Sequence, residues 1–95
     1  MIIALDYDNT YSRDTELWDK FITNAQEHGH RVQIVTSRSK DTPVEHEVWF
    51  KETYRVYVTY CEYRAKKQVT EELGIKIDIW IDDDPEYIGK GFIND

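Results

Sequence analysis

Hydrophobic residues along this chain follow two spacings, one typical of β-strands and the other of amphipathic helices. Short apolar runs predict strands at residues 2–7, 31–35, 55–59 and 76–81. Helical spacing predicts helices at residues 15–28, from about 43, at 63–73, and a short turn at 85–88. Because strands and helices alternate, the pattern predicts an α/β fold, with a parallel sheet of four to five strands flanked by helices.

The first predicted helix has the widest apolar face. Its hydrophobic residues share one side of a helical projection, and they are Leu17, Trp18, Phe21, Ile22 and Ala25. Gly29 follows directly and is expected to end the helix, since glycine adopts the left-handed conformation at little cost.

Residues 42–45 read Thr-Pro-Val-Glu, which is the pattern of a capping box with proline at the first helical position. A helix starting there would turn Val44, Val48 and Trp49 toward the core. The following helix, at 63–73, would bury a stripe of Ala65, Val69 and Leu73 and end at Gly74. Residues 91–93 are a candidate for a short fifth strand at the sheet edge.

The composition indicates one globular domain. The chain has 95 residues, of which 40% are hydrophobic. Its single cysteine, Cys61, has no partner for an internal disulfide and is expected to be a buried thiol in a reducing, cytoplasmic environment. No apolar run is long enough to span a bilayer, and the first residues lack the basic region of a signal peptide, so no membrane partner is expected.

The net charge is −7, from 12 basic and 19 acidic residues. This balance argues against broad binding to a nucleic-acid backbone, because such binding needs a basic surface. The acidic residues are concentrated in two clusters, each directly after an apolar run.

The first cluster contains Asp6 and Asp8, in the pattern D-x-D-x-T that ends at Thr10. Ligands of open α/β sheets bind beyond the carboxyl ends of the strands, where this pattern lies. Two adjacent carboxylates repel each other unless a cation, proton or base relieves them. A hard divalent cation fits, and Mg²⁺ is the commonest. Alone, the pattern is also compatible with an ordinary turn.

The second cluster is Asp82, Asp83 and Asp84, after the predicted fourth strand. Three consecutive acids there are electrostatically costly without a counter-charge. Asp84, which precedes Pro85, is also explained by the role of a helix cap, but that role does not explain Asp82 and Asp83. Together the two clusters predict a metal site.

Two further segments lie at positions suited to binding phosphate. Thr36, Ser37 and Arg38 follow the second strand, where a hydroxyl group and backbone N–H groups can contact phosphate oxygens. Lys66 and Lys67 stand near the start of the third helix, and either could supply a cation. Each segment alone is also compatible with an ordinary solvated loop or surface pair.

The order of these four segments resembles the four motifs of the haloacid-dehalogenase superfamily, over residues 2–85. The resemblance implies a Rossmann-like, three-layer fold with strand order 5-4-1-2-3. It also implies an Mg²⁺-dependent phosphatase that hydrolyses phosphate monoesters through an aspartyl-phosphate intermediate. The short segments on either side of Thr36 leave no room for a cap domain, so a capless, open site is expected.

The resemblance assigns roles residue by residue. Asp6 matches the nucleophile and Asp8 the general acid and base. Thr36 matches the residue that binds the transferred phosphoryl group, and Lys66, or alternatively Lys67, matches the cation. Candidate substrate-binding residues are Thr10, Ser37 and Arg38. Mg²⁺ would be held by Asp6, the backbone carbonyl of Asp8, and Asp83, with Asp82 behind them.

Three alternatives stay open. One is a nucleotidase or a phosphatase of nucleic-acid ends, and the second is a catalytically silent binding module with the same fold. The third, a receiver domain of response-regulator type, is disfavoured because no aspartate follows the third strand at residues 58–61. The phosphorylated partner could therefore be a small molecule or the end of a macromolecule.

Overall fold

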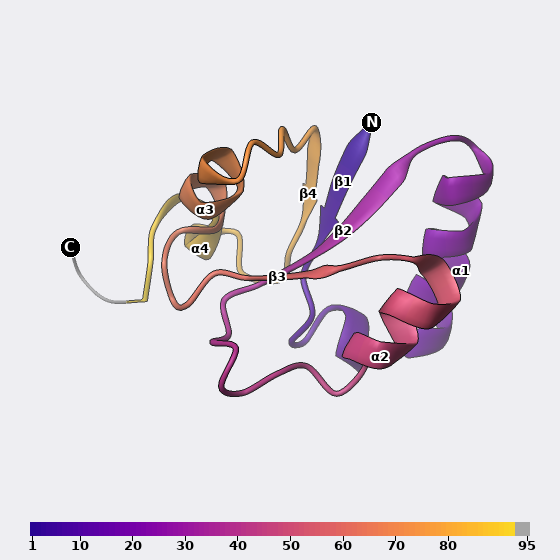
Figure 1. Cartoon of the computed structure of the whole chain (residues 1–95), viewed down its shortest axis with the longest axis horizontal. Helices are drawn as coiled ribbons and strands as arrows, with labels where there is room; N and C mark the ends of the chain where they lie inside the picture. Colours follow the sequence, from indigo (N-terminus) through magenta and orange to yellow (C-terminus); the bar gives the residue numbers. More distant parts are fainter. Residues whose placement is uncertain (93–95) are drawn as a thin grey trace.

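A computed structural model describes residues 1–92, which form a four-stranded parallel sheet flanked by helices (Figure 1). The strands are β1 (Ile2–Leu5), β2 (Arg31–Thr36), β3 (Val58–Tyr60) and β4 (Ile79–Ile81), in the order β3-β2-β1-β4. All three pairings are parallel. The predicted α/β class and four strands are confirmed, and within residues 1–92 no fifth strand is present.

The helical segments are α1 (Thr15–Glu27), α2 (Glu47–Trp49), α3 (Lys66–Glu72) and α4 (Glu86–Gly89), with a 3₁₀ turn, η1 (Tyr11–Arg13), and a π-helical turn, η2 (Phe50–Tyr54). Figure 1 shows α1 and α2 beside one part of the sheet, and α3 and α4 beside another. α1 begins where the Asp14 side chain accepts a hydrogen bond from the Leu17 N–H. It ends before Gly29, which has the predicted positive φ of 84°.

Alternate residues of the central strands pack into two separate clusters. Ile3, Leu5 and Ile34 pack in the larger cluster, which includes Ile22 of α1. Ala4 and Val35 belong to the smaller one, with Val69 of α3. Because successive side chains of a strand point to opposite faces, this division places apolar cores on both faces of β1 and β2.

The predicted helix start at residues 42–45 is wrong. These residues are not helical, and the helix begins only at Glu47. Their polar groups bond elsewhere instead: Arg38 donates to the carbonyls of Thr42 and Pro43, and Tyr7 donates to the Glu45 carboxylate. The later start also changes the buried face, so Val44 is buried as predicted but Val48 is 66% exposed and Trp49 is also exposed.

Other element boundaries are also shorter than predicted. β3 begins at Val58 rather than residue 55, and β4 begins at Ile79 rather than residue 76. Leu17 and Leu73 were expected in the core but are exposed, since they lie at the ends of their apolar faces. Gly91 and Phe92 are not in a strand, and the remainder of the predicted tail strand, Ile93, lies outside the described residues. Within the described part of the chain, no helix is long and apolar enough to cross a membrane.

Candidate active site

The acidic clusters meet at the carboxyl ends of β1 and β4. Asp6 follows β1 and its backbone N–H donates to the carbonyl of Ile81, 2.9 Å away, so the two strand ends are joined directly. A cavity of about 300 Å³ opens here, lined by Asp6, Asp8, Ser37, Lys66 and the three acids at 82–84. The predicted meeting of the two clusters is therefore confirmed, as parallel strands require when they share an edge.

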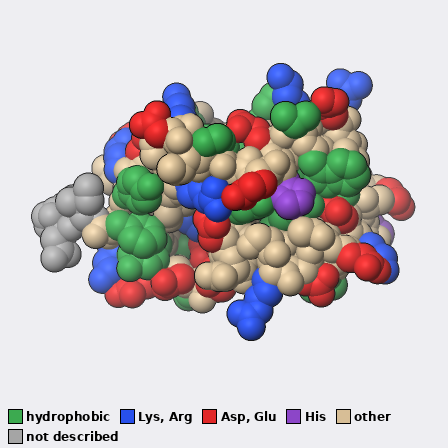
Figure 2. Space-filling model, turned by 90° about the horizontal axis from the view of Figure 1, so that it is seen from below, with side chains coloured by type: hydrophobic (Ala, Val, Ile, Leu, Met, Phe, Trp, Pro, Cys, Tyr) green, Lys and Arg blue, Asp and Glu red, His purple; other side chains and the backbone are tan. Residues whose placement is uncertain are grey.

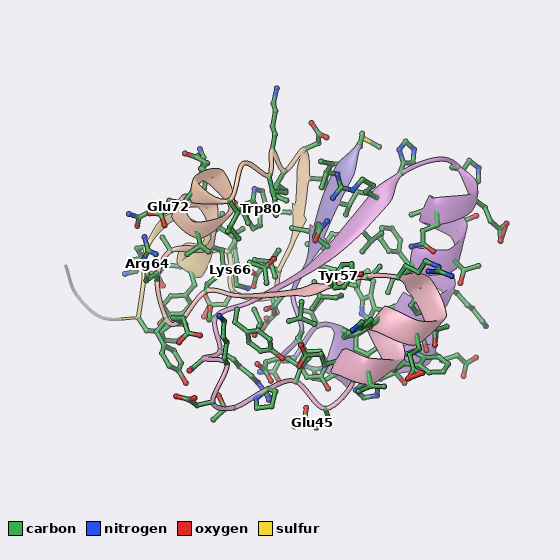
Figure 3. The ribbon with its side chains drawn as sticks, in the orientation of Figure 1. Glu45, Tyr57, Arg64, Lys66, Glu72 and Trp80 are labelled. Carbon is green, nitrogen blue, oxygen red and sulfur yellow. The ribbon has the colours of Figure 1, made fainter. Side chains whose placement is uncertain are left out.

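Lys66 is the cationic residue in the lining of this cavity. Its side chain is only 2% exposed, and its Nζ lies 2.7 Å from Oδ1 of Asp6 and 2.5 Å from Oδ2 of Asp82. Figure 3 shows it between α3 and the strands. Lys67, the alternative, is exposed. The sequence-based expectation that Lys66 rather than Lys67 reaches the site is confirmed by this placement.

Thr10 connects the two acidic clusters. Its hydroxyl oxygen lies 3.0 Å from Oδ2 of Asp6 and 3.2 Å from Oδ1 of Asp83, and it accepts the backbone N–H of Asp83. A single hydroxyl proton satisfies only one of these carboxylates at a time. Thr10 is buried, so its hydroxyl group holds the buried Asp6 carboxylate and the exposed Asp83 carboxylate close together.

Burial raises the pKa of Asp6 to about 7, although the Lys66 ammonium acts in the opposite direction and the neighbouring Asp83 reinforces the rise. Burial also lowers the pKa of Lys66, but Asp6 and Asp82 outweigh it, and the net pKa is raised. Lys66 therefore stays charged, while Asp6 needs additional positive charge to be fully ionised near neutral pH.

A pH dependence of stability follows for the metal-free protein. The pKa of Asp6 is about 7 in the folded protein, against 3.8 for an unperturbed aspartate, so folding favours the neutral form of Asp6. This stabilisation is fully present below about pH 4 and is lost as the pH rises through 7. At about 1.36 kcal/mol per pKa unit, the loss is at most about 4 kcal/mol. In chelator, we expect the free energy of unfolding of the wild type, relative to that of Asp6→Asn, to decrease as the pH is raised from 4 to 7. Urea titrations of both proteins measure it, and a constant difference would contradict the assigned shift.

Oxygen atoms of Asp6, Asp82 and Asp83 lie within 4.8 Å of one another and could hold a metal ion. The hydrogen bonds separate their roles. Oδ2 of Asp82 accepts from Lys66 and Oδ1 accepts from the backbone N–H of Asp84, so both oxygens of Asp82 already have a partner. Among the described residues, by contrast, the Thr10 hydroxyl is the only hydrogen-bond partner of Oδ2 of Asp6 and of Oδ1 of Asp83. An all-oxygen donor set with excess negative charge fits a hard divalent cation, with Asp6 and Asp83 as its side-chain ligands.

Metal binding should therefore affect stability. Saturating Mg²⁺ is expected to raise the melting temperature, by the equivalent of about 2.7 kcal/mol at a hundredfold excess over Kd. Asp83→Asn should make the metal-free protein more stable, because it removes one of two facing negative charges, and should shrink the Mg²⁺ effect. Thermal melts with Mg²⁺ and with chelator test this, with Asp84→Asn as the matched control. Coincident melts of the wild type in both conditions would show that the acids do not form one site.

Asp8 is held by a bidentate ion pair. Nε and Nη2 of Arg38 lie 2.9 Å and 2.7 Å from its two carboxylate oxygens. The remaining guanidinium nitrogen donates to the loop carbonyls of Thr42 and Pro43, and the guanidinium lies over the ring of Tyr7. Arg38, predicted to bind substrate, is thus used to fix Asp8 and the loop after β2.

Tyr7 extends this network in a way that sequence reasoning did not identify. Its buried hydroxyl group donates to Glu45, 2.9 Å away, and lies 2.7 Å from Nδ1 of His46. Tyr7 occupies the variable position between the two aspartates, so its hydrophobic character suggested only a strand residue. The loop that Tyr7 contacts is distant in sequence, and no local pattern indicated the pairing.

The two hydroxyl residues after β2 have different positions. Thr36 is almost fully buried, and its Oγ1 accepts the backbone N–H of Arg38, so it orders the turn. Ser37 lines the cavity with Asp6 and Lys66. Of the predicted residues, the structure therefore gathers Asp6, Asp8, Ser37, Lys66, Asp82 and Asp83 around one cavity, whereas Thr10, Thr36 and Arg38 support it.

Cys61 is fully buried, as predicted for a structural thiol, and burial raises its pKa to about 11. A neutral buried thiol is a poor nucleophile, which leaves Asp6 as the candidate for that role. Comparison of the chain with protein-family models, curated proteins and solved structures finds no match.

Proposed function

We propose that this protein is a capless, Mg²⁺-dependent phosphatase of Rossmann-like, three-layer architecture, which hydrolyses phosphate monoesters with Asp6 as the nucleophile. One observation carries the proposal: Lys66 Nζ lies 2.7 Å from a buried aspartate that shares its cavity with a second, metal-suited acid. A carboxylate between two cations can approach a phosphate dianion, whereas an unpaired acidic cluster would repel it.

In the first step, an oxygen of Asp6 attacks phosphorus and the bond from phosphorus to the leaving oxygen breaks. The leaving oxygen takes a proton from Asp8, and Asp6 becomes an aspartyl phosphate. In the second step, water gives a proton to Asp8 while its oxygen attacks phosphorus. This releases inorganic phosphate and restores the Asp6 carboxylate.

The contacts of Asp8 fix its position beside the cavity. Nε and Nη2 of Arg38 donate to its two carboxylate oxygens, so the carboxyl group is held in one orientation. Arg38 also fixes the direction of this base relative to the cavity. Further contacts with the carbonyls of Thr42 and Pro43, and with the Glu45 carboxylate 3.6 Å away, keep the guanidinium in place.

Lys66 neutralises the charge that develops on the phosphoryl oxygens and on Asp6. Its second partner, Asp82, accepts a hydrogen bond from the same ammonium group and so fixes the position of that group at the strand ends. Mg²⁺, held by Asp6 and Asp83, would supply further positive charge to the transferring phosphoryl group. In this arrangement, Asp82 binds Lys66 and is not a ligand of the metal.

The first test is turnover of an aryl phosphate with and without Mg²⁺. We expect release of inorganic phosphate in Mg²⁺ and its loss in excess chelator, with recovery on adding Mg²⁺ back. Turnover should be lost in chelator because, without Mg²⁺, carboxylates whose charge is not neutralised would repel the phosphate dianion. A malachite-green assay measures it, with circular dichroism in chelator as the control for folding. Turnover that is unchanged in chelator would remove the metal from the mechanism.

A further inference from the structure

Three aromatic side chains form a rim beside the candidate active site. The rings of Tyr87 and Phe92 stack with centroids 3.8 Å apart and an interplanar angle of 5°. Tyr63 meets Phe92 edge-on, with centroids 6.0 Å apart. Phe92 is 51% exposed and Tyr63 40% exposed, so the rim is open to solvent. Figure 2 shows hydrophobic side chains gathered at the left of the view, the end of the molecule where α4 lies in Figure 1.

The rim belongs to the same cavity as the nucleophile. Tyr87 and Phe92 line it together with Asp6 and Lys66. A larger hollow of about 500 Å³ nearby also has an aromatic residue, Trp18, but neither Asp6 nor Lys66 lines it. A group attached to a phosphate at Asp6 would therefore meet the aromatic rim within one continuous space.

The backbone fixes the rim in place. The N–H of Phe92 donates to the carbonyl oxygen of Tyr63, 2.8 Å away. Gly91 passes so close that a Cβ atom there would lie 2.6 Å from the same oxygen and 3.2 Å from Cα of Arg64. Only glycine permits this approach, so the position of Phe92 depends on Gly91.

We propose that the aromatic rim binds a planar ring in the leaving group of the substrate, so that the preferred substrates are small ring-bearing phosphate monoesters. This inference rests on the proposed function for the phosphate end. The remainder of the cavity is acidic and the net charge of the chain is −7, so an anionic polymer is disfavoured. Stacking attracts a ring without needing positive charge. Aryl phosphates and nucleoside monophosphates both carry this chemistry.

Binding of phosphonates tests the rim without requiring turnover, because their carbon–phosphorus bond resists phosphatase hydrolysis. In Mg²⁺, phenylphosphonate should bind the wild-type protein about tenfold more tightly than methylphosphonate, the scale of one stacked ring. Isothermal titration measures both constants. Equal affinities would overturn the proposal, even if the protein proves to be a phosphatase. A preference for the ring would support it, even if no phosphatase activity were found.

Two variants locate the effect, and neither changes a residue that contacts the phosphate. Phe92→Ala should remove the tenfold preference and leave methylphosphonate binding unchanged. Gly91→Ala should do the same while keeping every aromatic ring, because it displaces Phe92. Tyr57→Ala is the matched control, since this exposed tyrosine next to β3 lies away from the cavity (Figure 3). A preference retained in both rim variants would overturn the proposal.

Turnover measurements distinguish the two classes of ring-bearing substrate, aryl phosphates and nucleoside monophosphates. Hydrolysis of phenyl phosphate and of adenosine 5′-monophosphate is compared with that of glycerol phosphate, in the wild type and in Phe92→Ala. We expect kcat/KM to fall about tenfold in the variant for the ring class that the rim accepts, and to stay constant for glycerol phosphate. A uniform fall for all three substrates would contradict a specific role for the rim.

Discussion

Asp6→Asn is expected to abolish hydrolysis of an aryl phosphate, with a loss of at least about ten-thousandfold in kcat, the scale on which removing a catalytic nucleophile acts. The amide oxygen of asparagine is a far weaker nucleophile than a carboxylate, and it forms no stable acyl phosphate. Because Lys66 lies 2.7 Å from Asp6, the variant would also lose the ion pair that orients the attacking oxygen.

The fold should survive this substitution. Burial raises the pKa of Asp6 to about 7, so a neutral side chain is already tolerated, and Lys66 keeps its bond to Asp82. Steady-state kinetics with a matched Asp41→Asn control, at an exposed aspartate in the loop after β2, measures the effect. Circular dichroism checks that both variants are folded. Undiminished turnover in Asp6→Asn would exclude the aspartyl-phosphate mechanism.

The meeting of the acidic clusters could be predicted from sequence because it depends on topology alone. Asp6 and Asp82 each follow an apolar run, and parallel strands place their carboxyl ends at one edge. The direction of Lys66 could also be predicted, since Val69 fixes the buried face of α3. These expectations needed only the spacing of apolar residues and the rule of parallel sheets.

The segment at 42–45 shows what local patterns miss. Its capping-box pattern is genuine, but a helix there would have competed with the bonds from Arg38 and Tyr7. Those partners come from the ends of β2 and β1, and they connect the loop to Asp8. Long-range hydrogen bonds around the candidate site thus outweighed a local preference worth about 1 kcal/mol.

The aromatic rim could not be predicted for a related reason. Tyr63, Tyr87 and Phe92 come from three segments with no shared spacing. They meet because the segment containing Gly91 and Phe92 lies against the backbone of Tyr63. This contact depends on tertiary packing, which a hydrophobic pattern does not encode.

Lys66→Ala should lower kcat/KM at least a hundredfold, whereas Lys67→Ala should cost far less. The first figure corresponds to about 2.7 kcal/mol of lost transition-state stabilisation, the range found when one preorganised donor is removed. Lys66 is buried against Asp6 and Asp82, so its removal leaves two carboxylates without their cation. Residues one apart on a helix point about 100° from each other, and Lys67 is accordingly exposed.

The same burial means that Lys66→Ala should also destabilise the fold, by about 3–5 kcal/mol as for other broken buried pairs. Kinetics are therefore measured well below the melting temperature, and Lys66→Met is included because it keeps most of the side-chain volume. Lys66→Ala and Lys66→Met should both lower kcat/KM mainly through kcat, since Lys66 acts on charge that develops in the transition state. A larger loss at Lys67 would transfer the role of the cation to that residue. Turnover that is unchanged in all three variants would show that the measured hydrolysis does not arise at this site, because Lys66 is the only cation that contacts Asp6 among the residues described here. That result would favour a silent binding module.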